Sequence, residues 1–538
     1  MKSNGIAIIK TIVCWVLFDI RMTLIWMYLL SVVPLMVTRY PLLANRLCAI
    51  HPHIRTIRRL LVTGILITGG IMSVWVLGYP SAIDHTLVPV TMSALQLRDG
   101  VPLYHTMPNS WPTAILYGPA IHAIHWVGIT LVNDPMIGVN RMGLLVGWGA
   151  VGVMAWVFWQ HYPRDWAWWF WVMWWGFTML FETNTHFFTT RGGDSLMVLG
   201  MALALWGTVT KRAGGWGMVG AAIGLALTLG TKPHAGCYWV PLAGLAWEHQ
   251  GSRWTVRLIM ISLVLSGLML VNPWVSITGY LQVLAVTRHH PLTWSGGIQN
   301  ALFVGGVGLW VYAITRMVGI PFRWHIAMVT HGVSMALVCV VASKSGAGAW
   351  HLMPFLPVLM WQLAQRLHPH LNRLSIQQVV ILYWMVCITS GWMMQRFLIH
   401  WAARFRDHHV TQKAHDLRDI RQRFPTANII MGYTDPLYGD SNMRPYLHRP
   451  GQPYGWDACV LMEYRSGGVT FTHDREVLAP YDIIVIPNGP HPFKLKNWYG
   501  SPPYVWDDTF IATFYRYYTK TETGRYYTLW RKRPHPHG

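Results

Sequence analysis

Two lysines lie in short polar turns between long apolar stretches. Lys232 lies in GTKPHAG and Lys344 lies in ASKSGAGAWH. A cation at such a position can stabilise an anionic group, such as a phosphate, through charge-assisted hydrogen bonds. Lysines at the ends of apolar helices also extend to the polar interface without any further role. Both interpretations stay open for each lysine taken alone.

One carboxylate, Asp84, follows directly after a long apolar stretch, in AIDHTLVPV. A carboxylate held rigidly there, within reach of a hydroxyl group, could act as a general base. The alternatives are a solvated turn or an N-cap, since Asp-His-Thr precedes an apolar run. Asp99 in RDG and Asp134 in VNDP are predicted to form turns, because Asp-Gly and Asp-Pro favour them.

A polar stretch between two apolar runs brings acids and bases together. It contains Glu182, His186, Arg191 and Asp194. These side chains could contact a phosphate or a hydroxyl acceptor. A self-neutralising surface loop is an equally good interpretation, because exposed ion pairs contribute little.

A third polar group follows TGYLQVLAV, which is predicted to form an amphipathic helix with a basic end. It consists of Arg288, His289 and His290. An anionic lipid or a phosphate is a suitable target, and simple interfacial anchoring is the alternative. The adjacent histidines have no carboxylate or cysteine at ligand spacing, so no metal site is predicted. No motif implies a cofactor, although a divalent metal is left open.

The elements that must position these residues are apolar helices. Hydrophobic residues make up 53% of the chain and charged residues 12%, and apolar runs recur, for example at 60–77, 258–271 and 326–341. Runs of this length are typical of helices that cross a bilayer. We therefore predict a polytopic α-helical membrane protein with about 11–13 spans, located in the plasma (inner) membrane.

Charge predicts the orientation of these spans. The segment 39–59 carries five arginines and two histidines, so it is expected on the cytoplasmic side. The basic loops then alternate consistently if segment 116–131 lies at the outer surface without crossing. The last span, 379–394, delivers the remainder of the chain to the outside. The outer side then holds Asp84, Arg191, Lys232, Arg288 and Lys344.

The distribution of acids predicts the domain organisation. The first 400 residues hold eight acidic residues and the last 138 hold thirteen. We expect a membrane-associated segment with a basic loop at 1–59, a membrane body at 60–399 and an extracytoplasmic α/β domain at 400–538. In that domain we expect a helix at 414–423, strands at 428–432 and 481–487, and a terminal hairpin from 510–517 and 526–530.

The net charge of +21 does not indicate nucleic-acid binding here. Basic loops that orient the spans, together with attraction to anionic membrane lipid, account for it.

Four stretches together resemble the GT-C superfamily of membrane glycosyltransferases. They are AIDHTLVPVTMSALQLRDGVPLY, THFFTTRGGDSLMVLGMALALW, GWGMVGAAIGLALTLGTKPHAGCYWVP and KSGAGAWHLMPFLPVLM. The last is similar to the Lys-to-Pro stretch of bacterial members such as mannose and aminoarabinose transferases. A departure occurs in the second stretch, where Gly193 and Asp194 replace the usual glycine and glutamine.

The resemblance implies transfer of a hexose or pentose from a polyprenyl-phosphate-linked donor to a glycan, lipid or protein acceptor. Asp84 would be the base or the carboxylate that contacts the acceptor. The donor phosphate would be bound by Lys232, Lys344, Arg191 and Arg288. Residues that could support the acceptor are Asp194, Glu182, His186, His289, His290 and Tyr104, the last in GVPLY.

Two other functions fit parts of the pattern. A lipid-linked polysaccharide ligase or polymerase also uses outer basic residues, but it depends on a large central outer loop, whereas here the largest outer element is terminal. A transporter or flippase would place paired repeats and charges at mid-membrane. No acid occurs between Glu248 and Asp407, which argues against ion-coupled transport.

Overall fold

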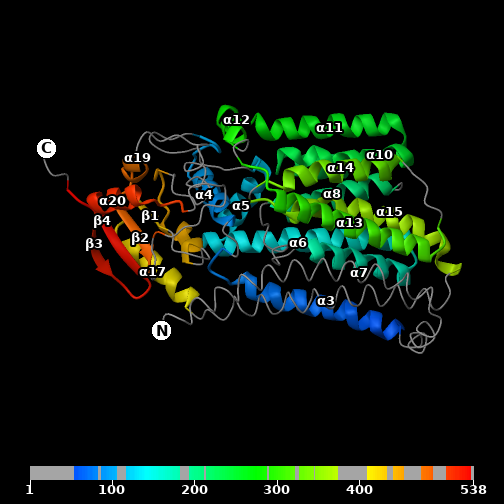
Figure 1. Cartoon of the computed structure of the whole chain (residues 1–538), viewed down its shortest axis with the longest axis horizontal. Coiled ribbons are helices and arrows are strands. Elements are labelled where there is room, and N and C mark those ends of the chain that lie inside the picture. The colour runs from blue at the N-terminus through cyan, green and yellow to red at the C-terminus, as the bar shows by residue number, and fades with distance from the viewer. Residues whose placement is uncertain are drawn as a thin grey trace.

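The computed structural model describes residues 54–82, 86–105, 117–181, 193–210, 214–286, 290–320, 326–344, 346–373, 409–432, 440–453, 474–488, 493 and 504–534. Within these ranges the chain forms a bundle of helices with a small sheet-containing domain at one end (Figure 1). The long helices of the bundle lie side by side along the long axis of the molecule.

The bundle consists of helices that follow one another through short connections. They are α3 (Ile54–Leu77), α6 (Pro135–His161), α7 (Arg164–Phe181), α8 (Asp194–Val209), α9 (Gly214–Leu229), α10 (Gly236–Gln250), α11 (Ser252–Leu270), α13 (Trp294–Met317), α14 (Ile326–Ala342) and α15 (Leu356–Leu367). Shorter helices lie between them: α4 (Leu87–Arg98), α5 (Pro119–Leu131), η5 (Pro233–Ala235), α12 (Ile277–Val286), η7 (Ala349–Phe355) and η8 (His368–Arg373).

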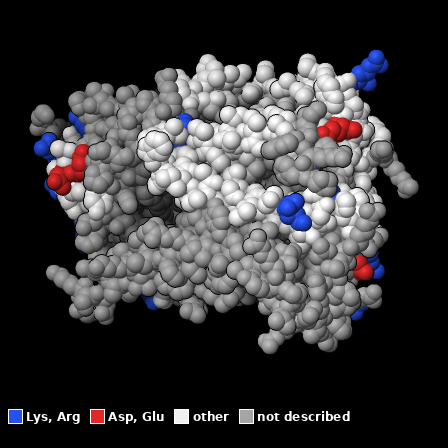
Figure 2. All heavy atoms as spheres, turned by 45° about the vertical axis from the view of Figure 1, so that its right-hand side comes forward, with Lys and Arg blue, Asp and Glu red and all other residues white. Residues whose placement is uncertain are grey.

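The described helices have the composition of a membrane protein. Three of them, α6, α11 and α13, are long and apolar enough to cross a membrane, and four shorter apolar stretches accompany them at 62–77, 194–209, 214–229 and 328–342. The charged side chains on the face shown in Figure 2 lie mostly toward its two ends. The predicted polytopic helical class is confirmed. The predicted segment 1–53 and the last span, 379–394, lie outside the described residues.

Helix α5 differs from the surface helix expected at 116–131. With 13 residues it is shorter than the roughly 20 that a crossing needs. It is nevertheless buried, because α4 and α6 pack on it and both of its histidines are fully enclosed. Burial lowers the pKa of His122 to about 4 and that of His125 to about 3, so both rings are uncharged at neutral pH.

Glycines allow α8 and α9 to pack at close range. A Cβ atom on Gly224 would lie 2.3 Å from the carbonyl oxygen of Gly200, and one on Gly207 would lie 2.0 Å from that of Gly217. Small residues let helix backbones approach in this way. The close packing fixes the beginning of α8 relative to the end of α9, where Asp194 and Lys232 lie.

The C-terminal domain is a four-stranded sheet with helices on both faces. Its strands are β1 (Ile429–Met431), β2 (Ile483–Pro487), β3 (Tyr518–Thr523) and β4 (Tyr527–Lys532), in the order β1-β2-β4-β3. β1 and β2 are parallel, and the other pairs are antiparallel. The predicted α/β class and the two predicted strands, 428–432 and 481–487, are confirmed.

Side chains alternate between the two faces of this sheet. Ile483 and Val485 pack toward α17 (Val410–Arg423) and η9 (Asp440–Leu447). Ile484 and Ile486 pack on the opposite side, toward α20 (Asp508–Tyr517) and α19 (Asp474–Leu478). Continuous apolar strands are expected when both faces of a sheet are covered.

The first half of the predicted terminal hairpin is wrong. Residues 508–517 form helix α20, and the hairpin consists of β3 and β4 instead. Asp507 caps the helix by accepting a hydrogen bond from the backbone N–H of Phe510, at 2.8 Å. Phe510 and Phe514 lie one turn apart and are both buried, so the apolar residues follow a helical period.

Candidate functional site

A buried ion pair joins the beginning of α8 to the residue that precedes η5. The Nζ atom of Lys232 lies 2.6 Å from Oδ1 of Asp194, and the two residues are 3% and 2% exposed. Removing two charges from water is costly, and close pairing offsets that cost. The second carboxylate oxygen of Asp194 is also buried, and it accepts no hydrogen bond from the described residues.

Two histidines extend this pair into a larger group. Nδ1 of His351, in η7, lies 3.3 Å from Nζ of Lys232 and 3.5 Å from Oδ1 of Asp194. Tyr238 donates a hydrogen bond to the carbonyl of His351 at 2.7 Å, and its hydroxyl lies 3.2 Å from Nε2 of His234. Burial, with His351 nearby, lowers the pKa of His234 well below its usual value. We call these five residues the Asp194 cluster.

Tyr104 lies one residue removed from the Asp194 cluster. The ring of Tyr117 lies 5.6 Å from Nζ of Lys232, within cation–π range. Tyr104 donates a hydrogen bond to the carbonyl of Tyr117 at 2.5 Å and is itself fully buried. Its φ of 62° is uncommon for a bulky residue. Backbone strain of this kind collects at functional sites, which agrees with a supporting role.

Lys344 and His290 lie in two chain segments that run beside each other. Lys344 forms an isolated antiparallel bridge with Leu292, and the N–H of Thr293 donates to the carbonyl of Ser343 at 2.8 Å. His290 is 9% exposed and precedes Leu292 by two residues. The chain continues from Lys344 into η7, which carries the histidine of the Asp194 cluster.

Several predicted site residues lie outside the described residues, and their roles stay predictions. They are Asp84, Glu182, His186, Arg191, Arg288 and His289. Of the predicted residues that are described, Asp194 and Lys232 are in direct contact.

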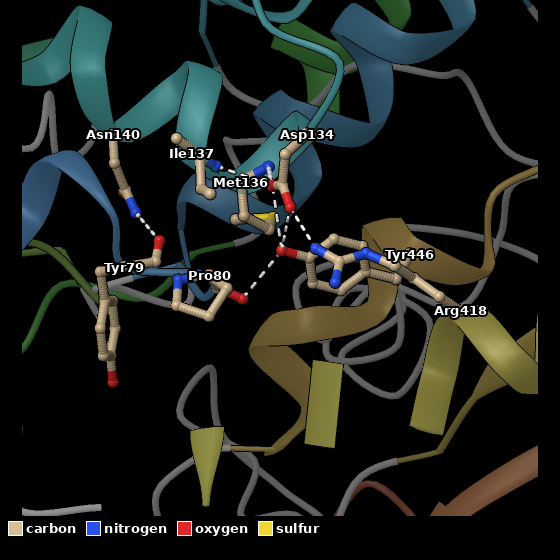
Figure 3. A network of polar contacts seen from close by, with 8 residues as sticks. All are labelled: Tyr79, Pro80, Asp134, Met136, Ile137, Asn140, Arg418 and Tyr446. Atoms are coloured by element: carbon tan, nitrogen blue, oxygen red, sulfur yellow. Dashed lines mark hydrogen bonds and ion pairs between the residues drawn. The ribbon is translucent and has the colours of Figure 1, made fainter. Parts of the chain in front are cut away.

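A second polar network joins the helix bundle to the C-terminal domain (Figure 3). Asp134 caps α6 by accepting hydrogen bonds from the backbone N–H groups of Met136 and Ile137, at 3.0 and 2.9 Å. From the C-terminal domain, the hydroxyl of Tyr446 lies 2.9 Å from each carboxylate oxygen, and Arg418 donates to one of them. Burial and the nearby Asp134 raise the pKa of Tyr446, so its hydroxyl keeps its proton.

A second interdomain contact lies at the end of α4. Nε2 of His448 is 2.6 Å from Oδ2 of Asp99, and both side chains are less than 10% exposed. A cleft of about 440 Å³ opens between the bundle and the C-terminal domain, lined by Leu95, Arg98, Asn133, Asp134, Pro135, Arg418, Pro445, Tyr446 and His448. Its volume suits a small polar ligand or a head group.

Within the described ranges, no group of three histidine, cysteine, aspartate or glutamate side chains is arranged to hold a metal ion. The Asp194 cluster contains a single carboxylate and a lysine, a set suited to anion contacts and proton exchange rather than to metal coordination.

Sequence reasoning missed several of these side chains. His234 and His351 stand in the same motifs as Lys232 and Lys344, so a histidine within two to seven residues of each lysine was an available signal. Asp134 was predicted as a turn residue, but it caps a helix and contacts the C-terminal domain. No local pattern could reveal its contact with Tyr446, because the two residues are 312 positions apart.

No protein-family model matches the chain, and no curated protein matches it. Two crystal structures of ArnT from Cupriavidus metallidurans share its fold. The apo structure is 13% identical, with a TM-score of 0.50, and the structure bound to undecaprenyl phosphate is 12% identical, with a TM-score of 0.51. Each alignment covers 87% of this chain and 98% of ArnT. ArnT is a GT-C glycosyltransferase, and the fold of this chain is that of the GT-C superfamily.

Proposed function

We propose that this protein is a membrane glycosyltransferase that moves a sugar from a polyprenyl phosphate to an acceptor. The observation that carries the proposal is its GT-C fold, shared over 87% of the chain with a crystal structure that contains undecaprenyl phosphate. The Asp194 cluster adds support, because charged residues buried among apolar helices are costly and usually functional.

The reaction requires one bond to form and one to break. The oxygen of the acceptor hydroxyl attacks C1 of the sugar, and the bond between C1 and the phosphate oxygen breaks. Polyprenyl phosphate leaves with the bonding electrons. Asp84 takes the proton of the acceptor hydroxyl, in the role of general base.

Cations stabilise the phosphate as it leaves. Lys232 and Lys344 are the described candidates, and Arg191 and Arg288 complete the proposed set. The Asp194 carboxylate holds the ammonium of Lys232 in place before the donor arrives. A group fixed in advance needs little reorganisation during the reaction, which makes its electrostatic effect larger.

The sugar is proposed to be a hexose such as mannose or a pentose such as aminoarabinose. The acceptor is a glycan, a lipid or a protein. Its hydroxyl would be oriented by supporting residues drawn from Asp194, Glu182, His186, His289, His290 and Tyr104.

The proposed location is the plasma (inner) membrane, with the C-terminal domain on the outer side. The proposed domains are the N-terminal segment 1–59, the catalytic body 60–399 and the extracytoplasmic domain 400–538. Basic loops on the opposite side support this orientation.

A comparison of two aspartate variants tests the proposal. Membranes that contain the protein receive polyprenyl-phosphate mannose or polyprenyl-phosphate aminoarabinose, and sugar transfer is measured. Asp84→Asn is expected to lower kcat by about 10²–10⁴-fold, the usual contribution of a general base. Asp165→Asn, the same change at an exposed position at the beginning of α7, is expected to have no effect.

Each other outcome has a defined meaning. An unchanged rate in Asp84→Asn would refute the assignment of the base. Repeated addition of glycan units would favour a polymerase or ligase. Movement of the lipid-linked sugar across the membrane without transfer would favour a flippase.

A further inference from the structure

Four consecutive carbonyl groups, those of residues 79–82, accept hydrogen bonds from side chains elsewhere in the molecule. The amide of Asn140, in α6, donates to the first and the third, at 2.9 and 3.0 Å. The hydroxyl of Tyr446 lies 3.1 Å from the second, and the amide of Asn442 donates to the fourth at 3.3 Å. Tyr446 and Asn442 belong to η9 of the C-terminal domain, so both parts of the molecule hold this segment.

The side chains that hold segment 79–82 are enclosed. Asn140 is 0% exposed, Tyr446 is 7% exposed and Asn442 is 8% exposed. The single hydroxyl proton of Tyr446 is shared between the carbonyl of Pro80 and the Asp134 carboxylate (Figure 3). Buried polar groups that are fully bonded lose their freedom to move, which makes such a network rigid.

Segment 79–82 leads directly to the proposed base. Ala82 and Leu87, on either side of residues 83–86, lie in one hydrophobic cluster with Met443 and Tyr446 of η9. Covalent geometry keeps the Cα atom of Asp84 within about 7 Å of that of Ala82. Helix η9 therefore holds both ends of the connection that carries Asp84.

We propose that Tyr446, together with Asn442, is a positioning residue for the transfer reaction. The C-terminal domain then acts as a part of the catalytic unit, because it fixes the connection between α3 and α4 against the helix bundle. This inference rests on the proposed function, in which Asp84 is the base. Displacement of a reacting group by about 1 Å can cost about a hundredfold in rate, so a small shift of this connection is sufficient.

The competing interpretation is that η9 only attaches the C-terminal domain to the bundle. In that case the loss of one hydrogen bond would lower stability and leave the catalytic constants unchanged. A positioning role predicts a lower kcat with an unchanged KM for the donor, because the affected interaction is made only in the transition state.

The test compares two tyrosine variants of the full chain. Tyr446→Phe removes the hydroxyl that contacts segment 79–82. Tyr518→Phe is the matched control, since that buried hydroxyl donates to the carbonyls of Leu478 and Tyr481 within the same domain. Two quantities are measured: the kinetics with the active polyprenyl-phosphate sugar, and the amide hydrogen exchange of the peptide that covers residues 79–90.

We expect Tyr446→Phe to lower kcat by about ten- to a hundredfold without changing the donor KM. Exchange in the 79–90 peptide should become faster in this variant and stay unchanged in Tyr518→Phe. Asn442→Ala should reproduce both effects, which keeps the test valid if Tyr446→Phe fails to fold. Wild-type kcat and wild-type exchange in Tyr446→Phe would overturn the inference.

Failure of the proposed function gives a different pattern. If Asp84→Asn retains full activity, the proposed base is wrong, whatever the tyrosine variants do. If Asp84→Asn is inactive while Tyr446→Phe and Asn442→Ala match the control, only the positioning role is wrong.

Discussion

At the scale of single residues, the contact between Asp194 and Lys232 joins two side chains that the sequence had marked separately. Each was expected near a phosphate or an acceptor, and their direct pairing was not anticipated. The pairing follows from burial, because a lysine that is 3% exposed is stable as a cation only beside an opposite charge. His351 could not be added from the sequence, because it is 119 positions from Lys232.

Lys232→Met should destabilise the protein by about 3–5 kcal/mol, because it leaves the Asp194 carboxylate buried and unpaired. The double variant Lys232→Met/Asp194→Leu should recover most of that loss while remaining inactive. Denaturant unfolding in detergent measures the stability, with the exposed Lys520→Met as control. Equal stability of Lys232→Met and the control would contradict the importance of the pair.

At the scale of elements, the helices of the bundle could be predicted because long apolar runs have few other solutions. The errors occurred where a short segment fits two periods. Residues 510–517 alternate well enough for a strand, but the Asp507 cap and the spacing of Phe510 and Phe514 favour a helix. Helix α5 was expected at a surface because of its histidines, and their burial depends on contacts that the sequence does not reveal.

The α8–α9 contact gives a direct test at this scale. Gly224→Ala places a Cβ atom 2.3 Å from a backbone oxygen of α8, so the helices must separate. We expect a loss of about 1–3 kcal/mol, together with reduced activity, because the Asp194 cluster lies at the end of this contact. Gly152→Ala, where nothing lies within 4 Å, is the matched control and should be neutral or slightly stabilising. Equal stability of the two variants would show that the helix spacing is not critical.

At the scale of the whole molecule, composition predicted a membrane body followed by an α/β domain, and both are found. The orientation of the molecule rests on the distribution of basic loops. The interdomain network of Asp134, Tyr446 and Arg418 had no sequence signal, because each residue alone has an ordinary composition and setting. Such contacts depend on the folded arrangement of distant segments.

Cysteine labelling tests the orientation. In a variant that lacks the six natural cysteines, Thr521→Cys in β3 and Ser252→Cys at the beginning of α11 are compared in intact cells. We expect a membrane-impermeant thiol reagent to label the first site from outside and the second only after lysis. The reverse pattern would place the C-terminal domain in the cytoplasm and contradict the proposed location.

The central claim is that a polyprenyl phosphate delivers the sugar. The most direct measurement follows both products when the purified protein, in lipid, receives a polyprenyl-phosphate sugar labelled in the sugar and the lipid, together with membrane extract as the source of acceptor. We predict that free polyprenyl phosphate appears in a one-to-one ratio with sugar on the acceptor, and that Asp84→Asn abolishes both. Appearance of neither product with any lipid-linked donor, or sugar transfer without release of polyprenyl phosphate, would contradict the claim.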